Sequence, residues 1–171
     1  MYSKLPKKRY NHTLEFLKKH VPAPAKILDL GVRNPFSEIM EQNGYTVFNT
    51  NGEDLDLLPE LVKNFDVDAV TAFEIFEHLL APFNVLKEIE TTKIVATVPL
   101  KLWFASAYRS KTDMWDRHYH EFEAWQFDWL MEKSGWNVKD FEKWTSPIKK
   151  VGIRPILRSF TPRYYAVYAE K

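Results

Sequence analysis

Asp29 and Gly31 stand at the end of a short apolar run, in the stretch Lys26-Ile-Leu-Asp-Leu-Gly-Val-Arg-Asn-Pro35. An apolar run that ends in Asp-x-Gly predicts a buried strand that delivers both residues into the turn before a helix. In α/β proteins this turn is where a nucleotide-like cofactor binds. Such turns usually carry two or three glycines, whereas Gly31 is followed by Val32-Arg-Asn-Pro35. The stretch therefore predicts a cofactor site with an altered turn.

Four further residues are candidates for proton transfer. Glu77 and His78 follow a third apolar segment, and His118 and His120 lie in an aromatic stretch. An imidazole titrates near neutral pH and can act as a general base, so His118 and His120 are the candidate catalytic residues. Polar residues that anchor loops, and a surface pair at a helix start, are the competing interpretations. No metal site is predicted, because the two histidines lack a clear third ligand.

Composition limits the class of protein. The 171 residues fit one domain over residues 1–171, with a flexible arm expected at residues 1–9, which are basic and interrupted by proline. Lys and Arg number 24 against 23 Asp and Glu, so the charge gives no reason to expect nucleic acid as a partner. There is no cysteine, no stretch like a signal peptide and no apolar run that could cross a bilayer. We expect a cytoplasmic protein without a membrane span.

The first hundred residues alternate between helical and strand-like patterns. Leu14, Leu17 and Val21 recur at helical spacing, and four short apolar segments have the length and type of buried strands. The expected strands are 27–30, 45–48, 67–73 and 93–98, and the expected helices between them are 36–42 and 82–90. This alternation predicts an α/β fold with a mostly parallel sheet.

The second half of the chain differs from the first, since all six tryptophans fall between Trp103 and Trp144. Residues 100–120 are rich in aromatic and charged side chains and show no clear period, which indicates a lid or a substrate-binding loop. The pattern after this loop predicts a helix with Phe122, Trp125, Trp129 and Leu130 on one face, then two strands at 136–144 and 164–169 joined by a loop that contains proline and arginine.

Several of these fragments, in this order, resemble the class I S-adenosylmethionine-dependent methyltransferases, and most closely their small-molecule and lipid branch. The fragments are Ile27-Leu-Asp-Leu-Gly31, Gly44-Tyr-Thr-Val47, Phe65-Asp66, Phe73-Glu-Ile-Phe-Glu-His78 with Pro82, Thr97-Val-Pro99, Arg117-His-Tyr-His-Glu-Phe122 and Ser134-Gly-Trp136. Each fragment alone is weak, but their common order is specific. The resemblance spans about residues 25–144 and implies a Rossmann-like sheet of about six strands.

The resemblance also implies S-adenosylmethionine as the cofactor. It assigns cofactor binding to Asp29, Gly31, Asn51, Asp54, Leu55, Phe73, Glu74 and His78. In the family an acid at the end of the second strand binds the ribose hydroxyls. Here that position falls on Asn51, a neutral amide whose hydrogen bonds lack the strength of a carboxylate's, unless Glu53 or Asp54 replaces it.

The spacing after the second strand departs from the family. Only thirteen residues separate Gly52 from Asn64, inclusive, whereas a helix, a strand and their connections need about twenty. We therefore expect that one edge strand and its helix are deleted, and that residues 57–65 form a short helix.

The resemblance implies methyl transfer to a small-molecule or glycan-type acceptor held under the 100–120 loop. The alternative is a pseudoenzyme that keeps the fold as a binding or interaction module, which the altered turn, Asn51 and the shortened middle would favour. Arg33 is either a solvated turn residue or occupies the space that the amino-acid tail of the cofactor needs. An unrelated nucleotide-binding α/β protein is a third hypothesis, although no phosphate-binding lysine motif is present.

Overall fold

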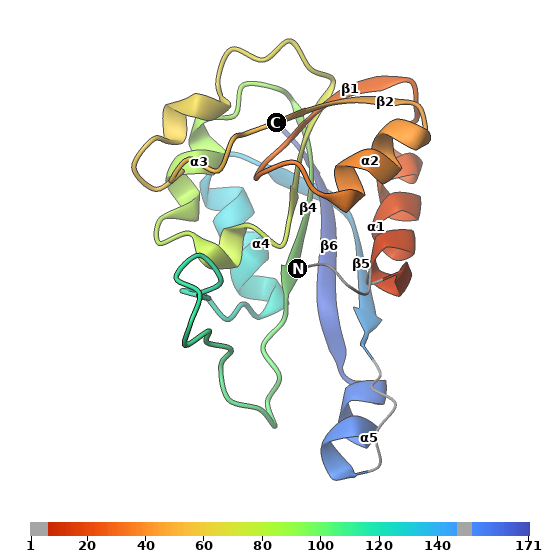
Figure 1. Cartoon of the computed structure of the whole chain (residues 1–171), viewed down its shortest axis with the longest axis vertical. Coiled ribbons are helices and arrows are strands. Elements are labelled where there is room, and N and C mark those ends of the chain that lie inside the picture. The colour runs from red at the N-terminus through yellow and green to blue at the C-terminus, as the bar shows by residue number, and fades with distance from the viewer. Residues whose placement is uncertain (1–6, 147–151) are drawn as a thin grey trace.

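A computed structural model describes residues 7–146 and 152–171, in which one six-stranded sheet lies between two helical layers (Figure 1). The strands are β1 (Ala25–Asp29), β2 (Tyr45–Asn49), β3 (Ala69–Phe73), β4 (Lys93–Pro99), β5 (Asn137–Thr145) and β6 (Pro162–Glu170). The helices are α1 (Lys7–His20), α2 (Pro35–Gln42), α3 (Pro82–Glu88), α4 (Ala124–Lys133) and α5 (Ile153–Phe160), with short 3-10 turns η1 (Pro59–Val62) and η2 (Phe76–His78). The alternation predicted from the sequence is confirmed.

The strand order is β2-β1-β3-β4-β6-β5. Strands β1 to β4 pair in parallel, and β6 runs antiparallel to both of its neighbours, β4 and β5. Strand β2 forms one edge of the sheet, and the described chain between β2 and β3 contains only the turn η1. The mostly parallel sheet of six strands, without the extra edge strand and its helix, agrees with the expectation from the sequence.

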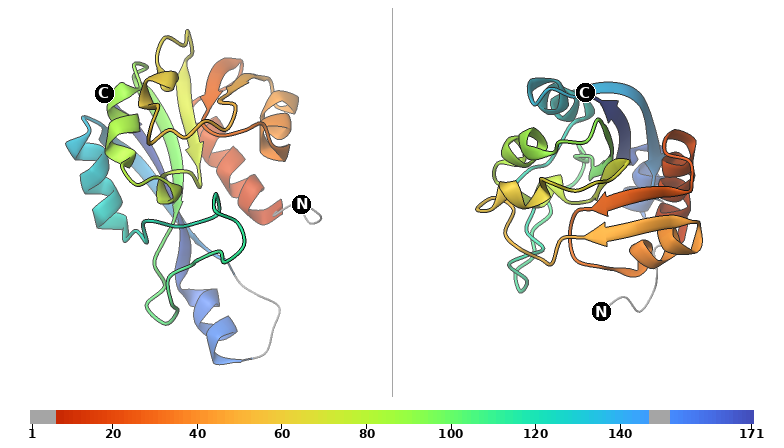
Figure 2. Two further views of the ribbon diagram at one scale, coloured as in Figure 1. Left: turned by 60° about the vertical axis from the view of Figure 1, so that its left-hand side comes forward. Right: turned by 90° about the horizontal axis from the view of Figure 1, so that it is seen from above.

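Both faces of the sheet are covered, which explains the continuous apolar character of its central strands. Side chains alternate between the faces along a strand, so Ile27 packs on one side and Leu28 on the other. Helices α1 and α2 cover the face of Ile27, and α3 and α4 cover the face of Leu28 (Figure 2). The chain therefore has two cores, one on each side of the sheet.

The N-terminal helix begins earlier than expected. Residues 7–9, which we assigned to a flexible arm, form the first turn of α1, and residues 1–6 lie outside the described part of the chain. Tyr10, Leu14 and Leu17 are buried against the sheet, and this apolar stripe supports a helix that begins at Lys7. The arm expected over residues 7–9 is therefore wrong, and the difference brings Arg9 into the folded body.

The buried face of α4 also differs from the expectation. Phe127 and Met131 are fully buried, whereas Trp125 and Trp129 are 48% and 64% exposed and pack against each other with ring centroids 4.8 Å apart. Both pairs are spaced four residues apart, so helical periodicity alone does not choose between them. Phe127 fits between Phe76 and Phe122 in the core, and the bulkier tryptophans remain outside.

The segment between β5 and β6 was expected to be a loop, but it contains helix α5, whose eight residues are all at least partly exposed. Pro155 stands in the first turn of this helix, where a missing N–H costs no helical hydrogen bond. Helix α5 and residues 100–120 lie at the same end of the molecule, beyond the carboxyl ends of β5 and β4 (Figure 1). None of the described helices has the length and apolar character that a bilayer crossing requires.

Candidate functional site

A cavity of about 320 Å³ opens at the carboxyl ends of β1, β3 and β4. Its lining includes Asp29, Gly31, Phe73, Glu74, Thr97 and His78, together with residues of α1. Strand β1 has β2 on one side and β3 on the other. The chain continues from β1 to β2 at the edge of the sheet and then returns past β1 to β3, so the cavity lies at the switch point of the strand order. In open α/β sheets this crevice is where ligands bind, and the volume is at the lower end of the usual range for small-molecule pockets, about 300–1,000 Å³.

Asp29 is buried below this cavity without a cationic partner among its hydrogen-bond donors. Its carboxylate accepts hydrogen bonds from Thr71 Oγ1 at 2.7 Å, Asn49 Nδ2 at 3.1 Å and Ser37 Oγ at 3.3 Å. Burial raises the pKa of Asp29 to about 6, and these three hydrogen bonds oppose the shift. Asp29 therefore connects the ends of β1 and β2, the middle of β3 and the start of α2.

Gly31 forms the turn itself. Its φ of +102° is in the left-handed region that glycine adopts most easily, and its N–H donates to Thr50 Oγ1 at 2.7 Å. A Cβ at this position would lie 3.1 Å from Cδ1 of Ile75, which follows β3. The turn after β1 and the turn after β3 therefore approach each other closely, and any side chain at position 31 would disturb both.

The residues that replace the expected glycines start helix α2. The side chain of Asn34 accepts a hydrogen bond from the Phe36 N–H at 2.8 Å, the Asn34 N–H donates to Ser37 Oγ at 3.3 Å, and Pro35 occupies the first helical position. Arg33 makes two hydrogen bonds to Glu41, at 2.7 and 2.5 Å, and does not line the cavity. Arg33 is therefore a solvated residue of the helix start and leaves the cavity free.

Glu74 and Arg9 place opposite charges in the cavity wall. Glu74 directly follows β3 with a φ of +59°, which is uncommon for a residue with a side chain, and its carboxylate accepts a hydrogen bond from Thr97 Oγ1 at 3.1 Å. The guanidinium of Arg9 lies 3.6 Å from Glu74 Oε2. Burial raises the pKa of Glu74, and Arg9 opposes this shift.

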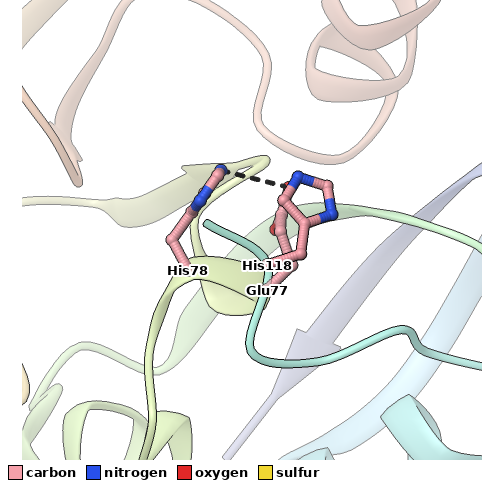
Figure 3. A group of neighbouring side chains, drawn as sticks. All are labelled: Glu77, His78 and His118. Atoms are coloured by element: carbon pink, nitrogen blue, oxygen red, sulfur yellow. Dashed lines mark ion pairs between the residues drawn. The ribbon is translucent and has the colours of Figure 1, made fainter. Parts of the chain in front are cut away.

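Glu77, His78 and His118 form a cluster beside the cavity (Figure 3). Each residue offers one atom that could bind a metal ion, and these three atoms lie within 4.8 Å of one another. His78 also lines the cavity. Burial raises the pKa of Glu77 well above its usual range, and the charge of Glu74 adds to the shift. Burial and the neighbouring His78 lower the pKa of His118, which favours the neutral imidazole.

Tyr119 and His120, at the end of the 100–120 segment, are held against the turn η2. The backbone N–H groups of Tyr119 and His120 donate to the carbonyl oxygen of Glu77 at 2.7 and 3.2 Å. The ring of His120 stacks on Phe122, and its Nε2 lies 3.3 Å from the carbonyl oxygen of Leu80. The structure thus brings His118 into the cluster with His78, whereas His120 contacts the surrounding backbone.

Three of the expected cofactor-binding residues lie away from the cavity lining. Asn51 is exposed, and its N–H donates to Glu53 Oε2 at 2.7 Å. Leu55 is buried in the core, and Asp54 accepts a hydrogen bond from the Asp56 N–H at 3.0 Å within its own loop. The other five (Asp29, Gly31, Phe73, Glu74 and His78) line the cavity together.

Sequence reasoning missed the contribution of helix α1 to the cavity. Arg9, Tyr10 and Thr13 line it, although Arg9 was placed in the arm. Helical spacing continues from Leu14 back to Tyr10, and this signal would have extended the helix to the residue beside Arg9. Nothing in the sequence places Arg9 opposite Glu74, because that contact depends on how α1 packs on the sheet.

The fold is that of the class I S-adenosylmethionine-dependent methyltransferases, because solved structures of such enzymes superimpose on almost the whole chain. A SAM-dependent methyltransferase from Archaeoglobus fulgidus superimposes with a TM-score of 0.66 at 15% identity, over 96% of this chain and 94% of that chain. The [4+2]-cyclase SpnF gives 0.64 at 12%, over 99% and 84%. The N-terminal domain of EvdMO1 with SAH bound gives 0.51 at 14%, over 95% and 80%.

These identities are low, so the likeness defines the fold and not the reaction. No family model matches the sequence, and no curated protein matches it either. The fold predicted from the order of the sequence fragments is therefore confirmed by structure alone.

Proposed function

We propose that the protein transfers a methyl group from S-adenosylmethionine to a small-molecule acceptor. The cavity at the switch point of a methyltransferase-type sheet, lined by the Asp29–Gly31 turn, is the observation that carries this proposal. When bound, S-adenosylmethionine supplies a methyl group on a sulfonium, which is reactive enough that positioning is the main task of the protein.

The cavity wall fits the amino-acid end of this cofactor. A zwitterionic tail needs an anion for its ammonium and a cation for its carboxylate, and Glu74 and Arg9 offer these charges 3.6 Å apart. The turn at Gly31 allows close backbone approach, because no side chain fills the space next to Ile75. These residues would bind the amino-acid tail, and the hydrogen bonds of the buried Asp29 would stabilise the conformation of the turn.

Glu53 is suited to bind the ribose hydroxyls in place of the expected acid at position 51. Hydrogen bonds from its own N–H and from that of Asn51 lower the pKa of Glu53, so its carboxylate is charged at neutral pH. The Asn51 side chain lies against the same carboxylate, with Nδ2 3.3 Å from Oε1. In this proposal Asn51 orients the acid and does not itself replace it, while Asp54 and Leu55 support the loop.

We infer that the 100–120 segment covers the acceptor. Two isolated β-bridges, which are backbone pairings, hold the segment together. One joins Leu100 to Phe122 at its base, and the other joins Arg109 to Arg117 in its middle. Asp116 reaches the cavity lining and accepts a hydrogen bond from the Tyr108 hydroxyl. The large aromatic side chains of Trp103 and Trp115 are exposed, and are available to exclude water when an acceptor is bound.

The two histidines proposed as catalytic have different roles in this site. His118 belongs to the cluster that reaches the cavity through His78. We propose that His120 positions the segment, since its ring stacks on Phe122 and its Nε2 contacts the Leu80 carbonyl oxygen.

Titration calorimetry with S-adenosylmethionine and S-adenosylhomocysteine tests cofactor binding. We expect both to bind the wild type, and Gly31→Ala to weaken binding at least about tenfold through the clash with Ile75. Gly44→Ala is the matched control, because Gly44 has a similar φ of +91° and meets only Ala23, outside the cavity lining. Absence of binding to the wild type at millimolar ligand would overturn the proposal.

A pseudoenzyme remains the second candidate, favoured by the neutral Asn51 at the position of the family's ribose-binding acid. Release of S-adenosylhomocysteine in the presence of a panel of hydroxyl- and amine-bearing acceptors separates the two. Turnover supports methyl transfer, whereas cofactor binding without turnover across the panel supports a binding module.

A further inference from the structure

The geometry points to a binding site for a divalent transition-metal ion of the zinc type, formed by Glu77, His78 and His118. Figure 3 shows the three side chains converging from the turn η2 and from the segment that follows β4. Two imidazoles and one carboxylate are a ligand set of many catalytic metal sites. The observations that support this metal site do not depend on the proposed methyl transfer.

The carboxylate of Glu77 is the strongest sign of a missing cation. Glu77 is 1% exposed, and its Oε2 accepts no hydrogen bond from any residue in the described ranges 7–146 and 152–171. An unpaired buried carboxylate is costly, so such groups are normally hydrogen-bonded, paired or bound to a metal. Its Oε1 is 3.8 Å from Nε2 of His78, which is too far for a hydrogen bond.

His78 is oriented in the manner of a metal ligand. Its Nδ1 lies 3.0 Å from the carbonyl oxygen of Arg117, and a carbonyl can only accept, so the proton of the neutral ring is on Nδ1. Nε2 then carries the free lone pair and faces Glu77. A hydrogen bond from the other ring nitrogen to a backbone carbonyl is the usual way to fix the tautomer of a metal-binding histidine.

His118 has a carboxylate in the corresponding outer position. Its Nδ1 is buried with no hydrogen-bond partner among the described residues and lies 3.8 Å from Oε1 of Glu121. Because Nδ1 faces Glu121, Nε2 is the nitrogen that His118 would offer to a metal ion. Figure 3 shows the His118 ring beside Glu77 and His78. The two rings lie edge to face with their centroids 4.8 Å apart.

The donor set selects the class of metal. Two imidazole nitrogens and one carboxylate suit zinc, cobalt or nickel, whereas magnesium and calcium prefer oxygen ligands only. Metal bonds of about 2.1 Å in a tetrahedral site place ligand atoms about 3.4 Å apart. Glu77 Oε1 and His78 Nε2 are 3.8 Å apart, and the ligand atoms of all three residues lie within 4.8 Å of one another, so the side chains must move closer together when the ion binds. Because His78 also lines the cavity, the bound ion would stand at the edge of the proposed acceptor site.

Metal binding is measured on the untagged full chain after exhaustive dialysis against a chelator. We expect one equivalent of Zn²⁺ with a dissociation constant of about 10 µM or tighter by calorimetry, and visible absorption bands when Co²⁺ is bound. A hundredfold excess of Mg²⁺ should not displace either ion. Glu77→Gln and His118→Gln should each weaken Zn²⁺ binding at least about tenfold, while His12→Gln, on the exposed side of α1, should leave it unchanged.

Circular dichroism of each variant verifies that it is folded. The wild-type measurement decides the proposal even if a variant does not fold, because failure to bind Zn²⁺ or Co²⁺ stoichiometrically overturns it. Equal affinity of a folded Glu77→Gln variant, or ready displacement by Mg²⁺, overturns it as well. The metal titration is performed without cofactor, so its outcome and that of the S-adenosylmethionine titration are separate.

Discussion

The guanidinium of Arg9 lies 3.6 Å from the carboxylate of Glu74, and this contact joins the first turn of α1 to the end of β3. Both side chains line the cavity and are mostly buried, with 29% and 16% of their side chains exposed. Arg9 also lies over the rings of Tyr10 and Tyr164, at 5.7 and 5.8 Å from their centroids. Helix α1 is therefore part of the cavity wall as well as part of the core.

Replacement of Arg9 by methionine should destabilise the protein by about 1–3 kcal/mol, because it leaves the buried carboxylate of Glu74 without its cation. Lys18→Met on the same helix is the control, since Lys18 pairs with Glu15 on the surface, and such pairs contribute about 0.5 kcal/mol or less. Urea unfolding at pH 7.5 measures both. Equal losses for the two variants would show that the Arg9–Glu74 pair behaves as a surface pair.

The helix-start interpretation of the altered turn predicts different effects for neighbouring residues. Asn34→Ala removes the cap of α2 and should cost about 1 kcal/mol in urea unfolding. Arg33→Ala should leave both stability and S-adenosylmethionine affinity nearly unchanged, because Arg33 pairs with Glu41 on the exposed surface. Tighter cofactor binding by the Arg33 variant would instead mean that the guanidinium enters the cavity.

The elements that were predictable from the sequence are those in which local pattern and burial agree. The apolar runs around Leu28 and Val95 can only be buried strands, and Asn34-Pro35 marks a helix start whatever the rest of the chain does. The five cavity residues at the ends of β1 and β3 or shortly after them were predictable for the same reason, since the carboxyl ends of parallel strands meet at one edge of the sheet.

The parts that were not predictable depend on packing between distant segments. Periodicity in α4 allowed either Trp129 or Phe127 to face the sheet, and only the shape of the core around Phe76 selects Phe127. Glu77 and His78 are adjacent in the sequence, but a loop without a period separates them from His118, the third member of the cluster. The hydrogen bonds of residues 119 and 120 to the Glu77 carbonyl bring the two together.

If Glu53 binds the ribose, Glu53→Gln should weaken S-adenosylmethionine binding by about tenfold, the value of one charge-assisted hydrogen bond. The loop itself should persist, because a glutamine oxygen can still accept from the Asn51 N–H. Glu60→Gln, at an exposed position in η1, is the matched control for loss of one negative charge. Calorimetry measures the S-adenosylmethionine affinity of both variants. Equal affinities of Glu53→Gln and Glu60→Gln would mean that Glu53 does not bind the ribose.

The carboxylate of Asp29 should make stability depend on pH in an unusual direction. Burial raises the pKa of Asp29 from 3.8 to about 6, so between these values the folded state binds more protons than the unfolded chain does. Stability therefore falls as the pH rises from about 4 to about 6, by about 2 kcal/mol for this group. Above about pH 7 the buried charge is almost fully present and its cost is nearly constant.

Asp29→Asn isolates this effect, because an asparagine can keep its oxygen toward Asn49 and Ser37 and direct its amide toward the Thr71 hydroxyl. Relative to the wild type, the variant should gain about 2 kcal/mol of stability between pH 4 and pH 7 in urea unfolding. Asp66→Asn is the control of opposite sign. The hydrogen bond from Lys26 lowers the pKa of the exposed Asp66, so its contribution is present at neutral pH and lost on acidification. If the difference in unfolding free energy between Asp29→Asn and the wild type does not change with pH across this range, Asp29 stays charged in the folded protein at pH 4. A cation, which the three observed hydrogen bonds do not supply, would then have to stabilise its carboxylate.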